Sequence, residues 1–359
     1  LLLSYVVTIY DEHSSSTGLL NNTKIAVCLV GGARRFELTG PSIVDRILRV
    51  YPNADLFLNS PLDSDSYKFL LLNEAPSIAT VRLFKQVIIP VTDSAERVLS
   101  ATASRTGRQG LLQYMSMVEG CIDLIRAHEE KNDFRYDWVI RTRVDGYWSD
   151  PLSPEAFVPG KYTIPVGSTY GGLNDRFGLG DYDTSMLALR RFSSIPVIDS
   201  AGGRRMSSEA IFMAQLIAQN VDYAAARIPF CIVTDHWFRY PPSVYNSTVM
   251  AMSSSGALGG AYCRPCTPLC NGSCAVREMR AAGEAWGTEE MGICDAGGDW
   301  EVGWEELFDR AVDQRLATKR EEIRVLKFRD CVEEFEKMNI RSGYWDGPSP
   351  AQICKMGLK

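Results

Sequence analysis

The sequence has no long run of lysine and arginine. Its 38 basic residues are outnumbered by 44 acidic ones, and the formal net charge is −6. A protein that mainly binds nucleic acid or a membrane surface concentrates positive charge in a patch or a tail. The charge pattern therefore argues against both classes of partner.

The sequence also lacks the two common glycine-rich phosphate motifs. The apolar segment 24–30 runs into Gly31 and Gly32, but no Gly-Lys-Ser/Thr follows, and the spacing is not that of a dinucleotide fingerprint. Two interpretations remain. The glycines either mark a plain turn from strand to helix, or they let the backbone approach a ligand whose phosphates meet Arg34 and Arg35.

The apolar run at the start of the sequence is short. LLLSYVVTIY covers ten residues before the chain turns polar at Asp11, whereas a helix that spans a bilayer needs about 20. We expect the run to be the luminal end of a truncated signal anchor, with a first strand or a frayed terminus as the alternatives. Residues 1–23 are accordingly assigned to a stem or to the end of such an anchor.

Cysteine is abundant. Five of the ten cysteines fall between Cys263 and Cys294. Three glycosylation sequons, which begin at Asn21, Asn246 and Asn271, accompany them. Together these features indicate a secretory, oxidising compartment. We expect a protein of the Golgi lumen, as a type II membrane protein, or else a secreted protein.

The cysteine block that starts at Cys263 has the spacing C-x2-C-x3-C-x3-C, which is also compatible with a zinc site. The nearby sequons favour disulfides, because they place the segment in an oxidising compartment. The pairing stays open. Cys294 is a candidate to close the block, and Cys331 and Cys354 pair with the block or with each other.

Length and composition are those of a globular protein: 359 residues, 45% hydrophobic and 23% charged. Strand and helix patterns alternate, which favours an α/β fold with a mostly parallel sheet. The expected strands are 24–30, 54–59, 81–91 at an edge, one that begins at 136, 162–166 and 230–233. The expected helices are 42–51, 109–131, 207–220 and one or two within 304–338, and loops are expected at 174–178 and 343–350.

The segment 136–150, YDWVIRTRVDGYWSD, joins an apolar run to a cluster of charges. Its three consecutive apolar residues, 138–140, are typical of a strand buried on both faces. The period of two then places Arg141, Arg143 and Asp145 on one side, at the carboxyl end where open α/β sheets bind ligands. Two cations and a carboxylate suit a diphosphate with a divalent metal. A local salt-bridge ladder is the alternative.

Further polar residues are candidates for a site. Asp175 lies in a polar loop and either holds an acceptor hydroxyl or forms a turn. Glu209 lies in the first turn of a helix, where the helix dipole favours a carboxylate without any catalytic role. Asp235 and His236 follow a strand, so that His236 is a candidate for a metal or phosphate contact.

The segments GGARRF, ADLFLN, YDWVIRTRVD and NDRFG occur in this order between residues 24 and 240, with a long helix before the third. The arrangement resembles glycosyltransferases of the GT-A type, and most closely poorly characterised polysaccharide or glycoprotein transferases of plants and microbes. The resemblance implies a Rossmann-like sheet that binds a nucleotide sugar, expected to be a UDP-sugar. The acceptor would be a glycan or a glycoprotein.

Many enzymes of this type hold Mn²⁺ on the diphosphate with an Asp-x-Asp motif. By resemblance Asp145 takes the place of the last aspartate, but Arg143 stands where the first would be. The expected metal is therefore Mn²⁺ or Mg²⁺ at Asp145, with His236 as a further candidate ligand, unless Arg143 neutralises the diphosphate directly. The expected donor-binding residues are Gly31, Gly32, Arg34, Arg35, Arg141 and Arg143.

Sugar transfer sets its own chemical demands. A sugar that leaves a diphosphate develops oxocarbenium character, and a cation must stabilise the charge of the leaving group. An inverting transfer also needs a base for the acceptor hydroxyl. Glu209 is the first candidate, followed by Asp175 and Asp235.

The predicted organisation is a GT-A-like domain at 24–252, a disulfide-bonded segment at 253–303 and a helical extension at 304–359 that packs back on the domain. A secreted carbohydrate-binding or scaffold protein that keeps the fold without catalysis is the alternative function. A sulfotransferase is a weaker third, because the sequence offers no convincing phosphate-cradling loop.

Overall fold

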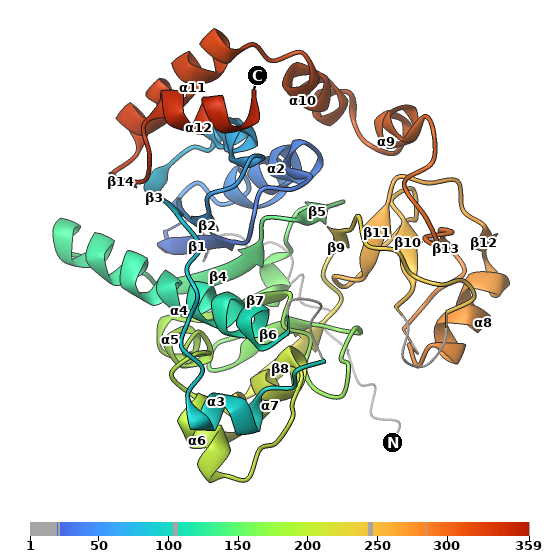
Figure 1. Ribbon diagram of the computed structural model, residues 1–359, viewed down its shortest axis with the longest axis horizontal. Helices are drawn as coiled ribbons and strands as arrows, with labels where there is room; N and C mark the ends of the chain where they lie inside the picture. Colours follow the sequence, from blue (N-terminus) through green and yellow to red (C-terminus); the bar gives the residue numbers. More distant parts are fainter. Residues whose placement is uncertain (1–19, 21, 103–106, 243–246, 285, 359) are drawn as a thin grey trace, which may run out of the picture.

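Two mixed β-sheets organise the chain (Figure 1). The computed structural model describes residues 20, 22–102, 107–242, 247–284 and 286–358. Sheets covered by helices confirm the expected α/β class. In spatial order, the strands of the first, eight-stranded sheet are β14 (Tyr344–Asp346), β3 (Ile78–Phe84), β2 (Ala54–Pro61), β1 (Ile25–Val30), β4 (Trp138–Arg143), β7 (Phe177–Asp181), β6 (Tyr162–Pro165) and β8 (Tyr223–Ala226).

Strand β1 lies in the middle of the first sheet, and all of its residues are buried. It pairs in parallel with β2 on one side and with β4 on the other. The parallel arrangement continues through β3 to β14, whereas β7 runs antiparallel to both β4 and β6. The carboxyl ends of β1, β2 and β4 therefore meet at one edge of the sheet.

One face of the first sheet is covered by α4 (Gly107–Asn132), the helix expected at 109–131. The disulfide between Cys28 and Cys121 joins β1 to this helix. Its buried stripe confirms the expected core role; it consists of Leu111, Met115, Val118, Ile122 and Ile125.

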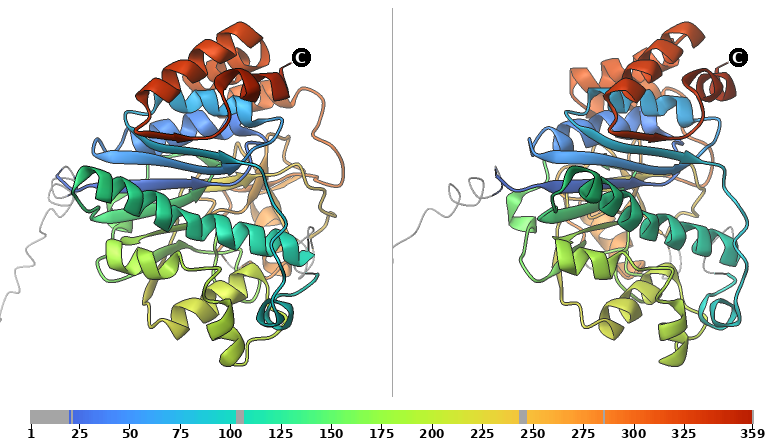
Figure 2. Two further views of the ribbon diagram at one scale, coloured as in Figure 1. Left: turned by 60° about the vertical axis from the view of Figure 1, so that its left-hand side comes forward. Right: turned by 90° about the vertical axis from the view of Figure 1, so that its left-hand side faces the viewer.

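The opposite face carries α2 (Phe36–Ile43), the π-helical turn η1 (Val44–Leu48) and the 3₁₀ helix η2 (Ser66–Glu74). The helix expected at 42–51 thus begins earlier, at Phe36, and passes through Pro41. All residues of α2 are buried, so that the segment lacks the amphipathic period that marks a helix in a sequence. Figure 2 shows α4 on one side of the sheet and α2, η2 and the C-terminal helices on the other.

The strand expected at 81–91 at the sheet edge differs from the structure in two ways. It ends at Phe84, because segment 85–91 lies against α4 instead of a strand: the amide of Gln109 donates to the carbonyl oxygen of Ile89 at 2.6 Å. It is not an edge strand either. Residues 344–346, expected as part of a loop, form β14 alongside it.

The remaining helices outside the C-terminal region are short, and several lie around β6 to β8. They are η3 (Pro154–Ala156), α3 (Asp93–Val98), α5 (Tyr182–Ala188), α6 (Ile195–Ser200), α7 (Ser208–Ala218) and α8 (Ser273–Ala281). Helix α7 confirms the helix expected at 207–220, and its cap is Ser207, which accepts a hydrogen bond from the backbone nitrogen of Ala210.

The second, six-stranded sheet combines distant parts of the chain. In spatial order it consists of β12 (Cys270–Asn271), β13 (Gly292–Ile293), β10 (Val249–Ala251), β11 (Tyr262–Arg264), β9 (Phe230–Val233) and β5 (Gly146–Trp148). β5 follows directly on β4, so that the two sheets adjoin at the end of the charged segment. Strands β11, β12 and β13 come from the cysteine-rich segment, after residue 253. Strands β5, β9 and β10 of the same sheet come from before residue 253.

All ten cysteines form disulfides, which confirms the disulfide interpretation and makes the zinc interpretation wrong. Cys294 closes the block by pairing with Cys266, and Cys331 pairs with Cys354. The other pairs join Cys28 to Cys121, Cys231 to Cys263 and Cys270 to Cys274.

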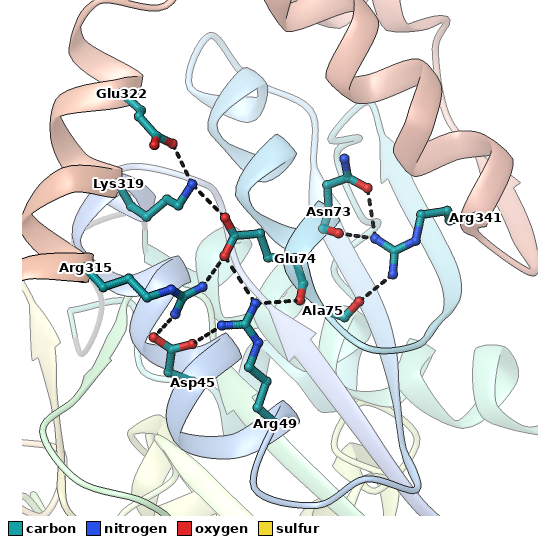
Figure 3. A network of polar contacts seen from close by, with 9 residues as sticks. All are labelled: Asp45, Arg49, Asn73, Glu74, Ala75, Arg315, Lys319, Glu322 and Arg341. Atoms are coloured by element: carbon teal, nitrogen blue, oxygen red, sulfur yellow. Dashed lines mark hydrogen bonds and ion pairs between the residues drawn. The ribbon is translucent and has the colours of Figure 1, made fainter.

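The C-terminal region forms α9 (Trp304–Ala311), α10 (Gln314–Arg324), α11 (Phe328–Arg341) and α12 (Pro350–Gly357). As expected, the last three of these helices pack back on the domain of the first sheet, because α10 contacts α2 and both α11 and α12 contact η2. Helix α9 instead places Phe308 in the core of the second sheet. A network of charges fixes α10 (Figure 3). Glu74 binds Arg315, Lys319 at 2.7 Å and Arg49 at 3.4 Å.

In the part of the chain that the structure describes, no helix is both long and apolar enough to cross a membrane. The expected signal anchor lies outside the described residues, as do the sequon asparagines Asn21 and Asn246. Asn271 is described and exposed at the end of β12.

The charge network around Glu74 generates a prediction about stability. Burial on its own raises the pKa of Glu74, but Lys319, Arg315 and Arg49 together lower it below its ordinary value. We expect Glu74→Gln to lower the free energy of unfolding by about 1 kcal/mol at pH 7. Because the pKa is lowered in the folded state, this stabilisation is present above the ordinary value of 4.5 and is lost as the pH falls through the lowered pKa.

Urea denaturation at pH 7 and at about pH 3 measures the effect. The matched control is Glu333→Gln, because the Glu333 side chain is 58% exposed and its contact with Arg329 is long, at 3.8 Å. This control is expected to stay within about 0.5 kcal/mol of the parent protein. An equal loss in both variants at pH 7 would contradict the assignment.

Candidate functional site

A pocket of about 420 Å³ lies where β1, β2 and β4 end. Its volume is in the usual range for small-molecule sites, roughly 300–1,000 Å³. The first half of α4 and the beginning of α7 form two of its walls. The residues with polar side chains that line it include Arg34, Asp63, Gln86, Gln113, Tyr114, Arg143, Asp145, Asp175, Arg176, Ser208, Glu209 and Tyr262.

The pocket brings together part of the set that the sequence suggests. Gly31, Gly32, Arg34, Arg143, Asp145, Asp175 and Glu209 line it. Arg35, Arg141, Asp235 and His236 are not among its lining residues. The functional roles of all these residues remain predictions.

Asp145 is held by arginines. Its carboxylate accepts hydrogen bonds from Nε of Arg143 at 2.8 Å and from Nη2 of Arg143 at 2.7 Å, and Nη1 of Arg34 lies 3.5 Å away. Burial on its own raises the pKa of Asp145, but the neighbouring Arg143 more than offsets this, and the pKa is lowered. Asp145 is therefore a carboxylate at neutral pH and both of its oxygens are engaged.

Two further arginines lie behind the pocket wall. Arg141 is fully buried, and its Nη1 donates to the hydroxyl of Tyr114 at 3.4 Å. Arg191 is 1% exposed, with Nη1 3.8 Å from Oδ2 of Asp175 and its guanidinium 3.4 Å from the centre of the Phe212 ring. Within the described part of the chain, Nε and Nη2 of Arg141 and both Nη atoms of Arg191 have no hydrogen-bond partner.

These buried guanidinium groups affect each other. Burial lowers the pKa of Arg191, and the positive charge of Arg141 lowers it further. Both groups nevertheless stay charged at neutral pH, because arginine loses its proton only far above that range. The pocket thus rests on a layer of positive charge that has few acceptors.

Asp175 and Glu209 form a pair of carboxyl groups at the beginning of α7. The hydroxyl of Ser208 donates to Oδ2 of Asp175 at 2.5 Å, and the hydroxyl of Tyr114 donates to its carbonyl oxygen at 2.9 Å. Burial and the negative charge of Asp175 raise the pKa of Glu209 to about 7. A carboxyl group with such a pKa exchanges protons readily at neutral pH, as a general acid or base must.

The loop before β7 connects the pocket to the second sheet. Nη1 of Arg176 donates to the carbonyl oxygen of Gly260 at 2.5 Å, and its guanidinium lies 4.1 Å from the centre of the Tyr262 ring. The amide of Asn174 donates to the carbonyl oxygen of Gly259 at 2.9 Å. The polar loop expected at 174–178 is shorter, because the chain pairs with β4 from Phe177 onward.

The residues outside the pocket have other neighbours. Nε of Arg35 donates to Oδ1 of Asp235 at 2.9 Å, and its guanidinium lies 4.2 Å from the Trp300 ring and 5.2 Å from the Trp304 ring. The backbone nitrogen of His236 donates to the hydroxyl of Thr234 at 3.1 Å. Arg35 and Asp235 thus belong to an aromatic cluster rather than to the pocket.

Several residues of the site carry no signal in the sequence. Tyr114 lies beside the apolar stripe of a core helix, and Arg191 follows another arginine just after a short helix. Arg176 and Tyr262 meet only because two sheets adjoin. Arg176 is the one residue of this set with a hint in the sequence, because it directly follows the polar pair Asn174-Asp175.

Arginine already occupies part of the donor set that a divalent cation would use at Asp145. Mg²⁺ and Mn²⁺ bind oxygen ligands, and each oxygen of Asp145 accepts a hydrogen bond from Arg143, which leaves one lone pair on each. Among the residues that the structure describes, no three histidine, cysteine, aspartate or glutamate side chains gather into a possible metal site.

Comparison with known proteins adds the family of the chain. Residues 20–359 match the family described as "Domain of unknown function (DUF7796)". No curated protein matches the sequence.

The carboxyl pair generates a prediction about pH. The pKa of Glu209 is about 7 in the folded protein against an ordinary 4.5, so that the folded state binds the extra proton between these values. Stability contributed by the protonated form therefore declines as the pH rises from about 4.5 to about 7. Glu209→Gln, which mimics the neutral form, should remove this decline.

The measurement is the free energy of unfolding from pH 4.5 to 8 for the parent protein, Glu209→Gln and the exposed control Glu333→Gln. The parent and the control should lose stability relative to Glu209→Gln over this range. Parallel curves for all three proteins would show that Glu209 titrates normally.

Proposed function

The chain belongs to the DUF7796 family, and we propose that it is a glycosyltransferase that uses a nucleotide-sugar donor and a glycan or glycoprotein acceptor. The observation that carries the proposal is the combination within one pocket of arginines and a carboxyl group with a pKa of about 7. A nucleotide sugar needs both functions: cations for its diphosphate and a base for the acceptor.

The position of the pocket supports a nucleotide ligand. It lies beyond the carboxyl ends of β1, β2 and β4, the edge at which open α/β sheets bind ligands. The Arg34 side chain is 55% exposed and that of Arg143 is 25% exposed, so that both reach solvent. Arginine forks bind phosphate oxygens in pairs, which suits a diphosphate.

The proposed reaction is an inverting transfer in which Glu209 is the base. The acceptor hydroxyl gives its proton to the Glu209 carboxylate while its oxygen forms a bond to the anomeric carbon. The bond between that carbon and the phosphate oxygen breaks, and the nucleoside diphosphate leaves with the electron pair. Arg34 and Arg143 would stabilise the negative charge that develops on the leaving group.

Asp175 would assist Glu209 by its charge. It is 3% exposed, and Ser208 and Tyr114 hold it in place. A fixed negative charge raises the pKa of a neighbouring carboxyl group, which brings a base closer to the operating pH. Asp175 is therefore assigned as a positioning and tuning residue and Glu209 as the catalytic base.

The disulfides support a location in the secretory pathway. Five disulfides, one of them in the core between β1 and α4, form and persist in an oxidising compartment. We accordingly place the protein in the Golgi lumen or outside the cell.

A non-catalytic carbohydrate-binding protein is the second candidate. An exposed tryptophan favours it: Trp237 is 58% exposed and donates from Nε1 to Oδ1 of Asp299 at 3.3 Å. An exposed indole beside a carboxylate offers a sugar both an apolar surface and a hydrogen-bond acceptor. Glycan binding without any nucleotide binding would favour this candidate over the transferase.

The test of the proposed function is a panel of UDP-, GDP- and CMP-sugars. A ligand that binds only the folded protein raises the melting temperature, and turnover is followed by release of the nucleoside diphosphate. We expect one nucleotide to stabilise the protein and its sugar to be transferred or slowly hydrolysed. Glu209→Gln should lower kcat by about 10²- to 10⁴-fold with little change in nucleotide affinity.

The exposed variant Glu333→Gln serves as the control and should keep the full kcat. Two results would contradict the proposal. One is that no nucleotide or nucleotide sugar binds in the presence or absence of metal. The other is that Glu209→Gln binds and turns over the donor as well as the parent protein does.

A further inference from the structure

We propose that arginine side chains, without a divalent metal, bind the diphosphate of the donor, and that Asp145 is the internal counter-ion that positions Arg143. The inference rests on the proposed function, because it concerns the same pocket. It differs from the metal-bound diphosphate that the likeness to Asp-x-Asp enzymes implies.

Asp145 is already bound to arginine. The residue is 4% exposed, and Arg143 binds its carboxylate through two parallel hydrogen bonds of 2.8 and 2.7 Å. A metal ion at this carboxylate would have to share both oxygens with Arg143, through the second lone pair of each. It would also place two positive charges beside the guanidinium groups of Arg143 and Arg34.

Few protein side chains could join Asp145 as metal ligands. A divalent cation with a site made by the protein alone needs several oxygen or nitrogen donors, whereas Mg²⁺ at a phosphate ligand can rely on one or two carboxylates and the phosphates themselves. The part of the chain that the structure describes contains no cluster of three such side chains. Asp235, the aspartate beside His236, is bound to Arg35 in the aromatic cluster instead.

The charges in and behind the pocket do not balance. Five guanidinium groups lie in or directly behind the pocket, those of Arg34, Arg141, Arg143, Arg176 and Arg191. Four carboxyl groups face them, those of Asp63, Asp145, Asp175 and Glu209. Buried charges are normally paired. The excess is therefore positive, and an anion rather than a further cation would balance it.

The turn at Gly31 and Gly32 places the Arg34 side chain at the pocket. Gly31 has φ +123°, a conformation that other residues rarely adopt, and a Cβ at Gly32 would lie 2.9 Å from Oδ2 of Asp63. This tight turn places Arg34 over the pocket, while the next residue, Arg35, faces the aromatic cluster. Arg34 contacts Asp145 only at 3.5 Å, so that little is lost when it moves to a phosphate oxygen.

The decisive measurement is the binding of UDP, GDP and inorganic pyrophosphate by calorimetry, each with EDTA, Mg²⁺ or Mn²⁺. We expect the nucleotide that binds to do so with the same Kd, within about twofold, in all three conditions. The affinity should fall as the salt concentration rises, because exposed arginines are screened. A Kd that weakens more than about tenfold in EDTA overturns the inference.

Two arginine variants show whether nucleotide affinity depends on the pocket or only on the total positive charge of the protein. Arg143→Met should weaken nucleotide binding about 10- to 100-fold, because a charge-assisted hydrogen bond contributes about 1.5–3 kcal/mol. The matched control is Arg329→Met, which removes the same charge from a side chain of α11 that is 86% exposed and does not line the pocket, and it should bind normally. Equal losses in both variants would contradict a specific arginine site.

Asp145→Asn separates the two assignments most clearly. An amide in place of a metal-binding carboxylate removes a negative charge and weakens metal-dependent binding. In place of a counter-ion, its oxygen can still accept a hydrogen bond from Arg143 and leaves the guanidinium charge to the phosphate. With EDTA present, the variant should bind the nucleotide within about threefold of the parent protein or more tightly. Its melting temperature without ligand shows whether it is folded, and the EDTA experiment on the parent protein needs no variant at all.

Failure of the inference and failure of the proposed function are distinguishable. Binding that requires Mn²⁺ and disappears in Asp145→Asn overturns the metal-free site but leaves the transferase standing. The absence of nucleotide binding under all conditions overturns the proposed function and the inference with it.

Discussion

Buried positive charge at the end of β4 is the constraint on which the site depends. Arg141 and Arg143 leave the same face of β4 toward α4, beside a cluster of buried apolar side chains from the sheet and the helix. A buried guanidinium needs acceptors or an anion to offset its lost hydration. Tyr114 from α4, Asp145 beyond β4 and Asp175 before β7 supply some of them. The walls of the pocket are the elements that carry these partners.

The covalent frame lies next to this charge. Cys28 of β1 is the register partner of Arg141 in β4, and its disulfide to Cys121 ties α4 to the sheet at that position. A disulfide that closes a loop of 93 residues stabilises a fold by on the order of 4 kcal/mol. An uncompensated buried charge costs about 3–5 kcal/mol. The stabilisation by this disulfide is thus comparable to the cost of a buried charge, and the disulfide lies where α4 covers the charged part of the sheet.

Sequence patterns predicted the parts of the site that local geometry controls. The period of two along β4 placed Arg143 and Asp145 together, and the apolar run before them correctly indicated a buried strand. Contacts between distant segments were out of reach. Tyr114 lies 27 residues before Arg141 on a helix whose stripe reads as core, and β14 pairs with a strand far away in the chain. Neither contact follows from a local period, because each depends on how whole elements pack.

The excess of buried positive charge costs the fold stability. Replacing buried charge with apolar residues of similar volume is often neutral or stabilising, so that a fold under selection for stability alone has no reason to bury Arg141 and Arg191. Their unpaired N–H groups lie behind the side chains that line the pocket, Tyr114 and Asp175. An anion in the pocket would reduce the electrostatic cost of both without contact. The stability that the buried charges cost would then return as binding energy for the proposed diphosphate.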